Sequence, residues 1–244
     1  MAGLRRFLVG VDDTDFGESI GTGALSRELN LFLVRRLGLR SHGITRHQFL
    51  VHPDIPYTSH NSSACIELSG ESTVEAIAAE ARQFVEFLFH PGADPGLCVL
   101  TPDQISPACV ALGIRAQNEV LKKQEAIDLA REHGVYLIEL GGTGQGIIGA
   151  LCGCALRSSG NDGRFISMRG IRELDGEMLV AELKSRTGID SVVNEDGAEL
   201  AEDCVVDTTG GARPELMLGR IVQPVLTRDD GSYRVPKRQK GEDK

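Results

Sequence analysis

The sequence predicts a mixed fold, α+β or α/β, made of two α/β domains of which the first is ferredoxin-like. Short apolar runs break off at acidic or glycine-rich turns, and most are followed by apolar residues at helical spacing. The hydrophobic content of 41% and the charged content of 25% are ordinary globular values, which argues against wholesale disorder. We expect residues 1–104 to form the first domain, 105–232 the second, and 233–244 a disordered basic tail.

The order of elements over the first hundred residues gives the ferredoxin-like prediction. The apolar run from Phe7 to Val11 is typical of a buried strand, and Gly38 ends the helix that follows. The predicted elements are strand 7–11, helix 25–37, strand 42–51, strand 64–68, helix 74–88 and strand 97–100. This order is that of a split βαβ fold, with one antiparallel sheet and both helices on one face.

A second series of strands and helices is predicted between residues 105 and 230. Its first half has helices over 107–115 and 118–133, a strand over 135–140, a glycine-rich turn and an apolar helix over 147–156. Its second half has a strand over 165–168, a helix over 176–187, and strands over 204–207 and 219–227. The acidic turn after the first strand and the glycine-rich turn after strand 135–140 therefore both follow apolar strands. Ligands of α/β proteins gather at such strand ends.

Composition and charge restrict the partners. The net charge is −9, whereas a protein that coats nucleic acid usually carries excess positive charge, because phosphate contacts dominate its affinity. Aromatic residues make up only 5% of the chain and none is tryptophan, which leaves few platforms for stacking bases. RNA contact through a local patch stays open. The one basic cluster is interpreted as a solvated C-terminus and consists of Arg234, Lys237, Arg238 and Lys240.

Cysteine usage and hydropathy predict a cytoplasmic protein. The six cysteines include no C-x-x-C pair, and most lie in apolar runs as buried free thiols do, so no zinc site is expected. Cys152 and Cys154 fall in an expected helix, where their side chains would diverge. The sequence shows no secretory segment and no apolar stretch long enough for a bilayer. A reducing cytosol and no membrane partner are the consistent interpretation.

Three aspartates crowd into four residues where the first strand ends: Asp12, Asp13 and Asp15. Ligands of α/β sheets gather at that end, and repulsion among the carboxylates favours a positive group between them. Hard oxygen ligands suit Mg²⁺, which takes one or two carboxylates and completes its shell with water and phosphate oxygens. The sequence therefore predicts a metal site at these three residues.

A helix start follows at Gly21-Thr22-Gly23. Glycines beside a hydroxyl expose backbone N–H groups and the positive end of the helix dipole, which suits an anion. We expect carboxylates for the metal and these amides for the phosphates to form a nucleoside triphosphate site. The alternative is that the aspartates form only a tight turn and Thr22 only a helix N-cap.

These motifs resemble those of a known family. Val9-Gly-Val-Asp-Asp-Thr-Asp15, the helix-start Thr22 and Ile55-Pro56-Tyr57 resemble the kinase-like domain of the archaeal tRNA-isoleucine agmatinylcytidine synthetases. Gly144-Gln-Gly-Ile-Ile-Gly-Ala-Leu151 resembles a glycine turn of that family's ferredoxin-like second domain. The resemblance spans most of residues 5–225, and the family's OB-fold and zinc ribbon have no counterpart in the sequence.

The resemblance implies an ATP- and Mg²⁺-dependent enzyme, kinase-like or ligase-like, that acts in tRNA modification. It assigns the metal to Asp12, Asp13 and Asp15, makes the first two catalytic, and makes Thr22 a residue that can itself be phosphorylated. We expect the cleft between residues 1–104 and the second glycine turn. The nucleotide-binding residues so implied are Gly21, Thr22, Gly23, Pro56, Tyr57, His60, Gly144 and Gly146.

One segment departs from the family pattern. The family's lysine and arginine after the I-P-Y motif are replaced by Thr58-Ser-His-Asn-Ser62, and Arg46, His47 and His60 are the basic residues nearby in sequence. These missing charges leave the acceptor open between a small molecule and RNA. They also favour an alternative in which a homo-oligomeric protein binds a nucleotide or metabolite without catalysis.

The second glycine turn supports a rival interpretation. Gly144-Gln-Gly-Ile-Ile-Gly149 matches G-x-G-x-x-G after an expected strand and at an expected helix start. Arg169, at the end of the next strand, would suit a 2′-phosphate, so an NADP-binding oxidoreductase is a second alternative. Against it, the glycines can simply permit close packing of the helix on a strand. Asp207-Thr-Thr-Gly-Gly211 can cradle an anion in a backbone nest or form a plain turn.

Overall fold

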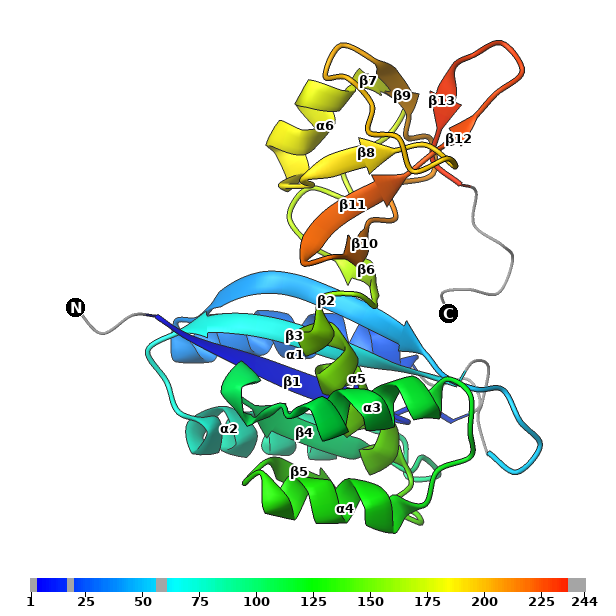
Figure 1. The fold of residues 1–244 in the computed structure, drawn as a ribbon. Coiled ribbons are helices and arrows are strands. Elements are labelled where there is room, and N and C mark those ends of the chain that lie inside the picture. The colour runs from blue at the N-terminus through cyan, green and yellow to red at the C-terminus, as the bar shows by residue number, and fades with distance from the viewer. Residues whose placement is uncertain (1–3, 17–19, 56–60, 237–244) are drawn as a thin grey trace.

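The computed structural model describes residues 4–16, 20–55 and 61–236 and shows two lobes (Figure 1). A nine-stranded sheet runs through both, in the order β5-β4-β1-β3-β2-β6-β10-β11-β8. Its first five strands lie in the larger lobe, and β6 lies where the lobes meet (Figure 1). A four-stranded sheet, β12-β13-β9-β7, completes the smaller lobe.

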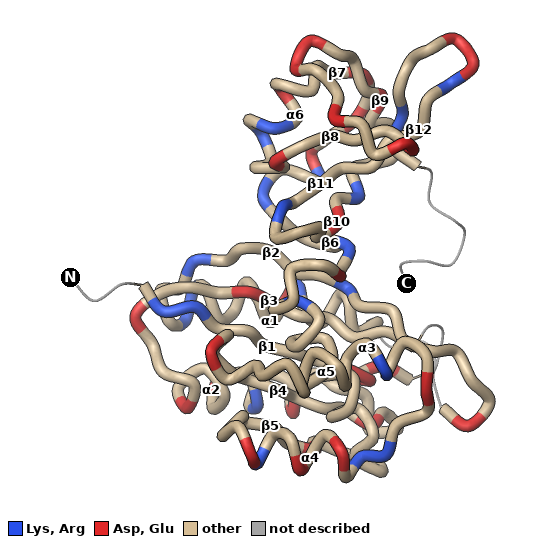
Figure 2. The backbone as a smooth tube through the Cα atoms, viewed as in Figure 1, with Lys and Arg blue, Asp and Glu red and all other residues tan. Residues whose placement is uncertain are grey.

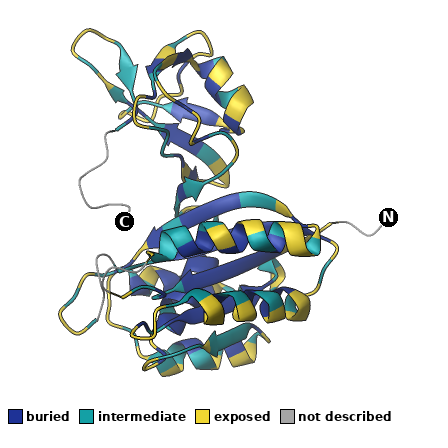
Figure 3. Cartoon of the chain, turned by 180° about the vertical axis from the view of Figure 1, so that it is seen from behind, coloured by how far each residue is buried: buried dark blue, intermediate teal, exposed yellow. Residues whose placement is uncertain are grey.

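The first six elements confirm the ferredoxin-like prediction. They are β1 (Arg5–Asp12), α1 (Thr22–Leu37), β2 (Arg40–Gln48), β3 (Ser62–Gly70), α2 (Val74–Leu88) and β4 (Gly96–Leu100). Neighbouring strands in the order β4-β1-β3-β2 are all antiparallel. Helices α1 and α2 cover one face, and their exposed residues point outward when this face is viewed in Figure 3. Phe7, Leu29 and Ile66 lie in the aliphatic core between helices and sheet.

The opposite face of the same sheet is covered by later elements. These are a 3-10 turn (Pro102–Gln104), α3 (Pro107–Ala116), α4 (Lys123–Glu132) and α5 (Gly146–Ser159), while β5 (Tyr136–Glu139) joins the edge of the sheet. A second core joins Leu8, Cys98 and Leu151, so the sheet is buried on both faces. Strand β5 pairs antiparallel with β4. The chain thus passes the expected boundary after residue 104 without leaving the packed body of the first four strands.

The smaller lobe is built from short strands around one helix. Its elements are β6 (Arg164–Ser167), β7 (Glu177–Leu179), α6 (Val180–Thr187), β8 (Ser191–Val193), β9 (Val205–Asp207), β10 (Glu215–Met217), β11 (Arg220–Pro224), β12 (Leu226–Thr227) and β13 (Tyr233–Arg234). A third hydrophobic core, which includes Leu183 and Val206, lies among them. Strand β6 pairs antiparallel with β2 and with β10, and so ties this lobe to the larger one.

The smaller lobe departs from the predicted elements. Residues 177–179, expected to begin a helix, form β7 because β9 offers a pairing edge that buries Met178. Strands β8 and β10 were not predicted, since three residues carry too little periodicity. The expected tail is also wrong at its start, because Tyr233 pairs with Val206 and Val235 is buried. Residues 237–244 lie outside the described residues.

The cysteine prediction is confirmed in its main point. All six cysteines are free, and five of them are buried: Cys65, Cys98, Cys109, Cys152 and Cys154. Within the described part of the chain, no helix combines the length and apolar character needed to cross a membrane.

Candidate functional site

The predicted aspartate turn opens onto a cleft of about 480 Å³. Asp12 is the last residue of β1, and Asp13 continues the turn with a left-handed φ of 51°, which is uncommon outside glycine. The chain then reaches the start of α1. Of the predicted residues, those that line the cleft are Asp12, Asp13, Asp15, Thr22, Gly23 and Gly146. The structure therefore brings together motifs that are more than a hundred residues apart.

The start of α1 is tied to the aspartate turn by the Thr22 hydroxyl. Thr22 Oγ1 donates to Asp15 Oδ1 at 2.8 Å, and the Thr22 N–H points to the same oxygen at 3.3 Å. The buried Thr14 approaches Thr22 Oγ1 with its hydroxyl at 3.1 Å. The N-cap is Gly21, which has no side-chain cap, so Thr22 is the first helical residue and the N-cap alternative is wrong.

Burial and mutual repulsion disfavour charge on the first two aspartates. Burial, followed by the Asp13 carboxylate, raises the pKa of Asp12 to about 8. Burial, followed by Asp94 and Asp15, raises the pKa of Asp13 to about 6. Asp12 Oδ1 accepts the Asp13 N–H at 2.9 Å, which only partly offsets these effects. A cation in the cleft would stabilise both charged carboxylates.

The three aspartates do not form a ready-made metal cage. Among residues 4–16, 20–55 and 61–236, no three acidic, histidine or cysteine side chains are placed to hold a metal ion together. Asp15 is bound to Thr22, while Asp12 lies against Gly149, so the three predicted metal ligands have different surroundings. Asp12 and Asp13 still fit a Mg²⁺ ion that takes two carboxylates and phosphate oxygens, as this ion commonly does.

Asp94, which sequence reasoning missed, holds the second glycine turn against the aspartate turn. Its N–H donates to the Asp13 carbonyl at 3.1 Å, and its own carbonyl accepts the Gly146 N–H at 3.2 Å. Its carboxylate accepts hydrogen bonds from Thr143 Oγ1 and the Gly144 N–H. The role of Gly144 is thus corrected: it serves Asp94 and does not line the cleft. An aspartate before a strand gave no signal, because its partners are some fifty residues away.

Three arginines from different parts of the chain line the same cleft as the carboxylates. Arg27 of α1, Arg46 of β2 and Arg172 after β6 all line it. Sequence proximity indicated only Arg46, whose Nε donates to Ser62 Oγ at 2.8 Å. The other two come from a helix face and from the smaller lobe, so only the fold brings them in.

The predicted phosphate-facing segment is only partly described. Ile55 and Asp54 line the cleft, whereas Pro56, Tyr57 and His60 lie outside the described residues. His47 is not in the cleft. It is fully buried between Thr45 Oγ1, 2.8 Å from its Nε2, and Asp162 Oδ1, 2.6 Å from its Nδ1.

Comparison with solved structures then identifies the fold. The structure of apo TiaS, a tRNA agmatidine synthetase, aligns over 62% of this chain and 35% of that chain, with 19% identity and a TM-score of 0.53. The TiaS–tRNA–ATP complex aligns over 74% and 43%, with 19% identity and a TM-score of 0.56. A tRNA fluorescent labeling enzyme gives 62% and 36%, with 21% identity and a TM-score of 0.54. The chain shares the fold of part of TiaS.

The likeness to TiaS confirms, at the level of fold, the resemblance predicted from the aspartate and glycine motifs. This chain corresponds to 35–43% of the length of those TiaS chains. No family model and no curated protein matches the sequence.

The dinucleotide alternative loses its structural context. A dinucleotide fold needs parallel strands around the glycine turn, but β5 before the turn is antiparallel to β4, and β6 after α5 is antiparallel to β2. The glycines are needed for packing, as a Cβ at Gly146 would lie 2.3 Å from the Asp94 carbonyl oxygen and one at Gly149 1.8 Å from Asp12 Oδ2. Arg169 is exposed and does not line the cleft.

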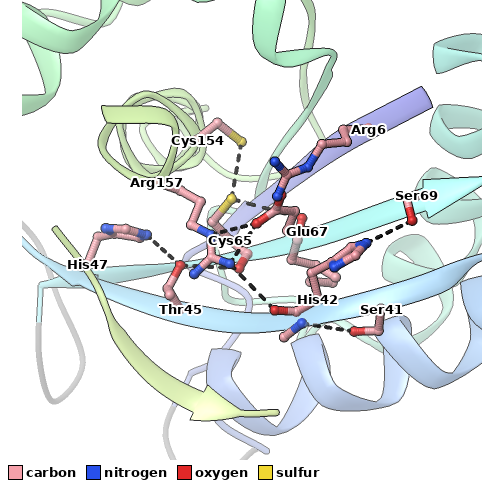
Figure 4. Close-up of polar contacts among 12 residues, drawn as sticks. Arg6, Ser41, His42, Thr45, His47, Cys65, Glu67, Ser69, Cys154 and Arg157 are labelled. Carbon is pink, nitrogen blue, oxygen red and sulfur yellow. Dashed lines mark hydrogen bonds and ion pairs between the residues drawn. The ribbon is translucent and has the colours of Figure 1, made fainter. Parts of the chain in front are cut away.

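A buried ion pair fixes helix α5, which carries these glycines, to the sheet (Figure 4). Arg157 Nη2 lies 2.6 Å from Glu67 Oε2, and Arg6 of β1 contacts the other carboxylate oxygen of Glu67. The Arg157 guanidinium also stacks on Phe165 of β6 at 4.6 Å. One side chain thus connects α5, β3 and the first strand of the smaller lobe.

Proposed function

We propose that the cleft binds a nucleoside triphosphate with Mg²⁺ and transfers a phosphoryl or nucleotidyl group to an acceptor, in the manner of a tRNA-modifying enzyme. The observation that carries the proposal is the convergence of Asp12 and Asp13, a helix start and three arginines on one cleft, whose other acidic lining residues are Asp15, Asp54 and Glu119. Carboxylates suit a metal, and amides and guanidinium groups suit phosphates. Solved TiaS structures with ATP and with AMPCPP, tRNA and agmatine support this ligand class.

In this proposal the residues act mainly by position and charge. Asp12 and Asp13 would hold the Mg²⁺ ion, which when bound neutralises charge on the phosphates. Arg27, Arg46 and Arg172 take the place of the lysine and arginine that the family motif carries after its I-P-Y segment. Guanidinium groups stabilise phosphate oxygens through paired hydrogen bonds.

In this proposal Thr22 receives a phosphoryl group. Its hydroxyl donates to Asp15 Oδ1 at 2.8 Å, so the carboxylate would take the proton as the oxygen attacks the γ-phosphorus of ATP, the β–γ bond breaks and ADP leaves. Incubation with ATP and Mg²⁺ should add one phosphate to Thr22, as detected by peptide mass spectrometry. Thr22→Ser should retain the label and Thr22→Ala should lose it, whereas label on another residue in the wild type contradicts the assignment.

Calorimetric titration tests the binding site. The wild type should bind ATP with Mg²⁺, and Asp13→Asn should weaken that binding by about 10-fold or more, since even outer-shell changes cost that much in metal affinity. Asp128→Asn is the matched control, because Asp128 is an exposed aspartate on α4 far from the cleft lining. Equal affinity in the wild type and Asp13→Asn would refute the proposed site.

A non-catalytic binding protein is the second candidate, favoured by the replaced family segment at residues 58–62. Chromatography of the nucleotide after incubation separates the two. Release of ADP or AMP, lost in Asp13→Asn, supports an enzyme. Tight binding with intact ATP in the presence of candidate small-molecule and RNA acceptors supports the binding protein.

A further inference from the structure

A second hollow, of about 590 Å³, lies in the smaller lobe beside the cleft. It is formed by β6, by residues 171–175 after β6, and by residues 210–213 before β10. The residues that line it are Arg164, Phe165, Ile166, Ile171, Arg172, Leu174, Asp175, Gly210, Gly211, Ala212 and Arg213. Ile166 and Arg172 also line the aspartate cleft, so the two hollows adjoin.

The charge of this hollow is opposite to that of the chain. Three arginines, Arg164, Arg172 and Arg213, line it against the single acid Asp175, although the net charge of the protein is −9. Lys and Arg positions near β6 and β10 can be followed in Figure 2. A concentration of guanidinium groups in an otherwise acidic protein favours an anionic ligand.

The strand register adds a further arginine at the border of the hollow. Arg164 of β6 is paired directly with Arg46 of β2, which lines the cleft. Like charges placed opposite each other on neighbouring strands are destabilising. On its other side Arg164 is paired with Glu215, which offsets part of this charge. The arginines therefore continue from one hollow to the other across β6.

The floor of the hollow exposes backbone. Gly210 and Gly211 both have a φ of 91°, and a Cβ added at Gly210 would meet nothing within 4 Å. Conformation, and not lack of space, thus requires glycine at this turn. The acid of the turn is directed elsewhere, because Asp207 accepts the Thr209 N–H at 2.9 Å and pairs with Arg228. It does not line the hollow.

The lining also includes apolar residues that suit an organic ligand. Phe165, Ile171 and Leu174 are among them, and Arg157 stacks on the Phe165 ring. The volume falls in the range of small-molecule sites. A bare inorganic ion would leave this apolar surface unused.

We propose that the second hollow binds the phosphate group of an organic phosphate, either free or at the end of a nucleotide strand. The guanidinium groups of Arg164 and Arg213 contact the phosphate oxygens, and the apolar wall packs on the organic part. Phosphate binding in the second hollow does not depend on the proposed function of the cleft. Use of the hollow as the acceptor subsite does rest on that function, because the shared Arg172 would then contact both ligands.

The proposal is tested by calorimetric titration of the full chain with ribose 5-phosphate and, in a second arm, with a short 5′-phosphorylated oligoribonucleotide. Arg213→Gln and Arg164→Gln should each weaken binding by about 10-fold or more, the loss expected for a charged hydrogen bond. Arg220→Gln is the matched control, since this exposed arginine of β11 pairs with Glu199 on the same lobe. Its binding should equal that of the wild type.

Further measurements separate the outcomes. Asp13→Asn should bind ribose 5-phosphate normally, so failure of the nucleotide site does not imitate failure of this one. Arg213→Lys keeps the charge and should recover part of the affinity, which a folding defect would not allow. A strand that binds at least 10-fold more tightly than the sugar phosphate identifies the phosphate source as nucleic acid. Wild-type affinity in both glutamine variants, or no binding by the wild type, overturns the proposal.

Discussion

The cleft at the aspartate turn and the second hollow share the lining residues Ile166 and Arg172. They differ in the charge of their other residues and in the elements that form them. The cleft has two carboxylates whose pKa values burial raises, at a strand end packed under α5. The hollow has arginines on short strands and a turn of the smaller lobe. Under the two proposals, Arg172 would contact an anion on either side, and the cation would bind in the cleft beside Asp12 and Asp13.

The largest expected effect comes from the buried ion pair between Arg157 and Glu67. Arg157→Met leaves Glu67 buried with only Arg6 beside it, so the free energy of unfolding should fall by about 3 kcal/mol. Because Arg157 also holds Phe165, sugar phosphate binding in the hollow should weaken more than ATP binding in the cleft. Urea unfolding and titration measure the two effects.

Arg82→Met on α2 provides the reference for that measurement. Arg82 forms an exposed pair with Glu86, whose loss should cost less than about 1 kcal/mol. Similar unfolding curves for the two variants would show that the Arg157 pair does not stabilise the fold, and would contradict its role as the connection between lobes.

The next effect acts on the cleft alone. A Cβ at Gly149 would lie 1.8 Å from Asp12 Oδ2, so Gly149→Ala should displace this carboxylate and cost about 1–3 kcal/mol of stability. ATP–Mg²⁺ binding should be lost, while ribose 5-phosphate binding stays at the wild-type value. Gly38→Ala is the control, because a Cβ there meets nothing and only its φ of 65° opposes the change. Equal nucleotide affinity in Gly149→Ala and Gly38→Ala would contradict the assignment of nucleotide binding to the cleft.

A smaller effect, on the pH dependence of stability, is expected where the two lobes join. Burial lowers the pKa of His47, between Thr45 and Asp162 and near Arg157, below its usual value. The unfolded chain therefore takes up the His47 proton more readily, so this residue's contribution to stability should fall below about pH 6.5, by up to about 1.4 kcal/mol per pH unit. The raised pKa values of Asp12 and Asp13 act in the opposite direction, so the contribution of His47 is measured as a difference from a variant. Chemical unfolding between pH 5 and about 8 measures this slope.

Two variants identify the residue responsible. His47→Gln should remove this contribution, so acidification below pH 6.5, the usual value for histidine, should cost the variant less stability than the wild type. His90→Gln is the matched histidine control, since His90 is exposed and stacks on Phe16. An unchanged slope in His47→Gln would assign the acid sensitivity to another group.

The sequence was most informative where one element carries a long pattern. Phe7–Val11 and 74–88 are buried or amphipathic over many residues, so hydrophobic periodicity alone predicted β1 and α2. Glu215–Met217 and Glu177–Leu179 are three residues long, and their strand conformation comes from partners elsewhere in the chain. Tertiary pairing decides such segments, and local propensity cannot.

The same limit applies to the site. The aspartate turn and Thr22 lie close together in sequence, so residue types and spacing sufficed to predict that they share a site. Arg172 lines the cleft only because β6 lies beside β2, and Asp94 contacts the aspartate turn only because β4 lies beside β1. Spacing does not show the hydrogen bond that binds Asp15 to Thr22 and sets Asp15 apart from the other two aspartates.

Paramagnetic NMR with Mn²⁺ in place of Mg²⁺ tests the central claim most directly. In the presence of a non-hydrolysable ATP analogue, the backbone amide signals of Asp12, Asp13, Thr22 and Gly149 should broaden first, and those around Gly210 much less. Asp13→Asn should remove the broadening at sub-stoichiometric Mn²⁺. Broadening centred on another part of the chain, or equal broadening in Asp13→Asn, would contradict a metal–nucleotide site at the end of β1.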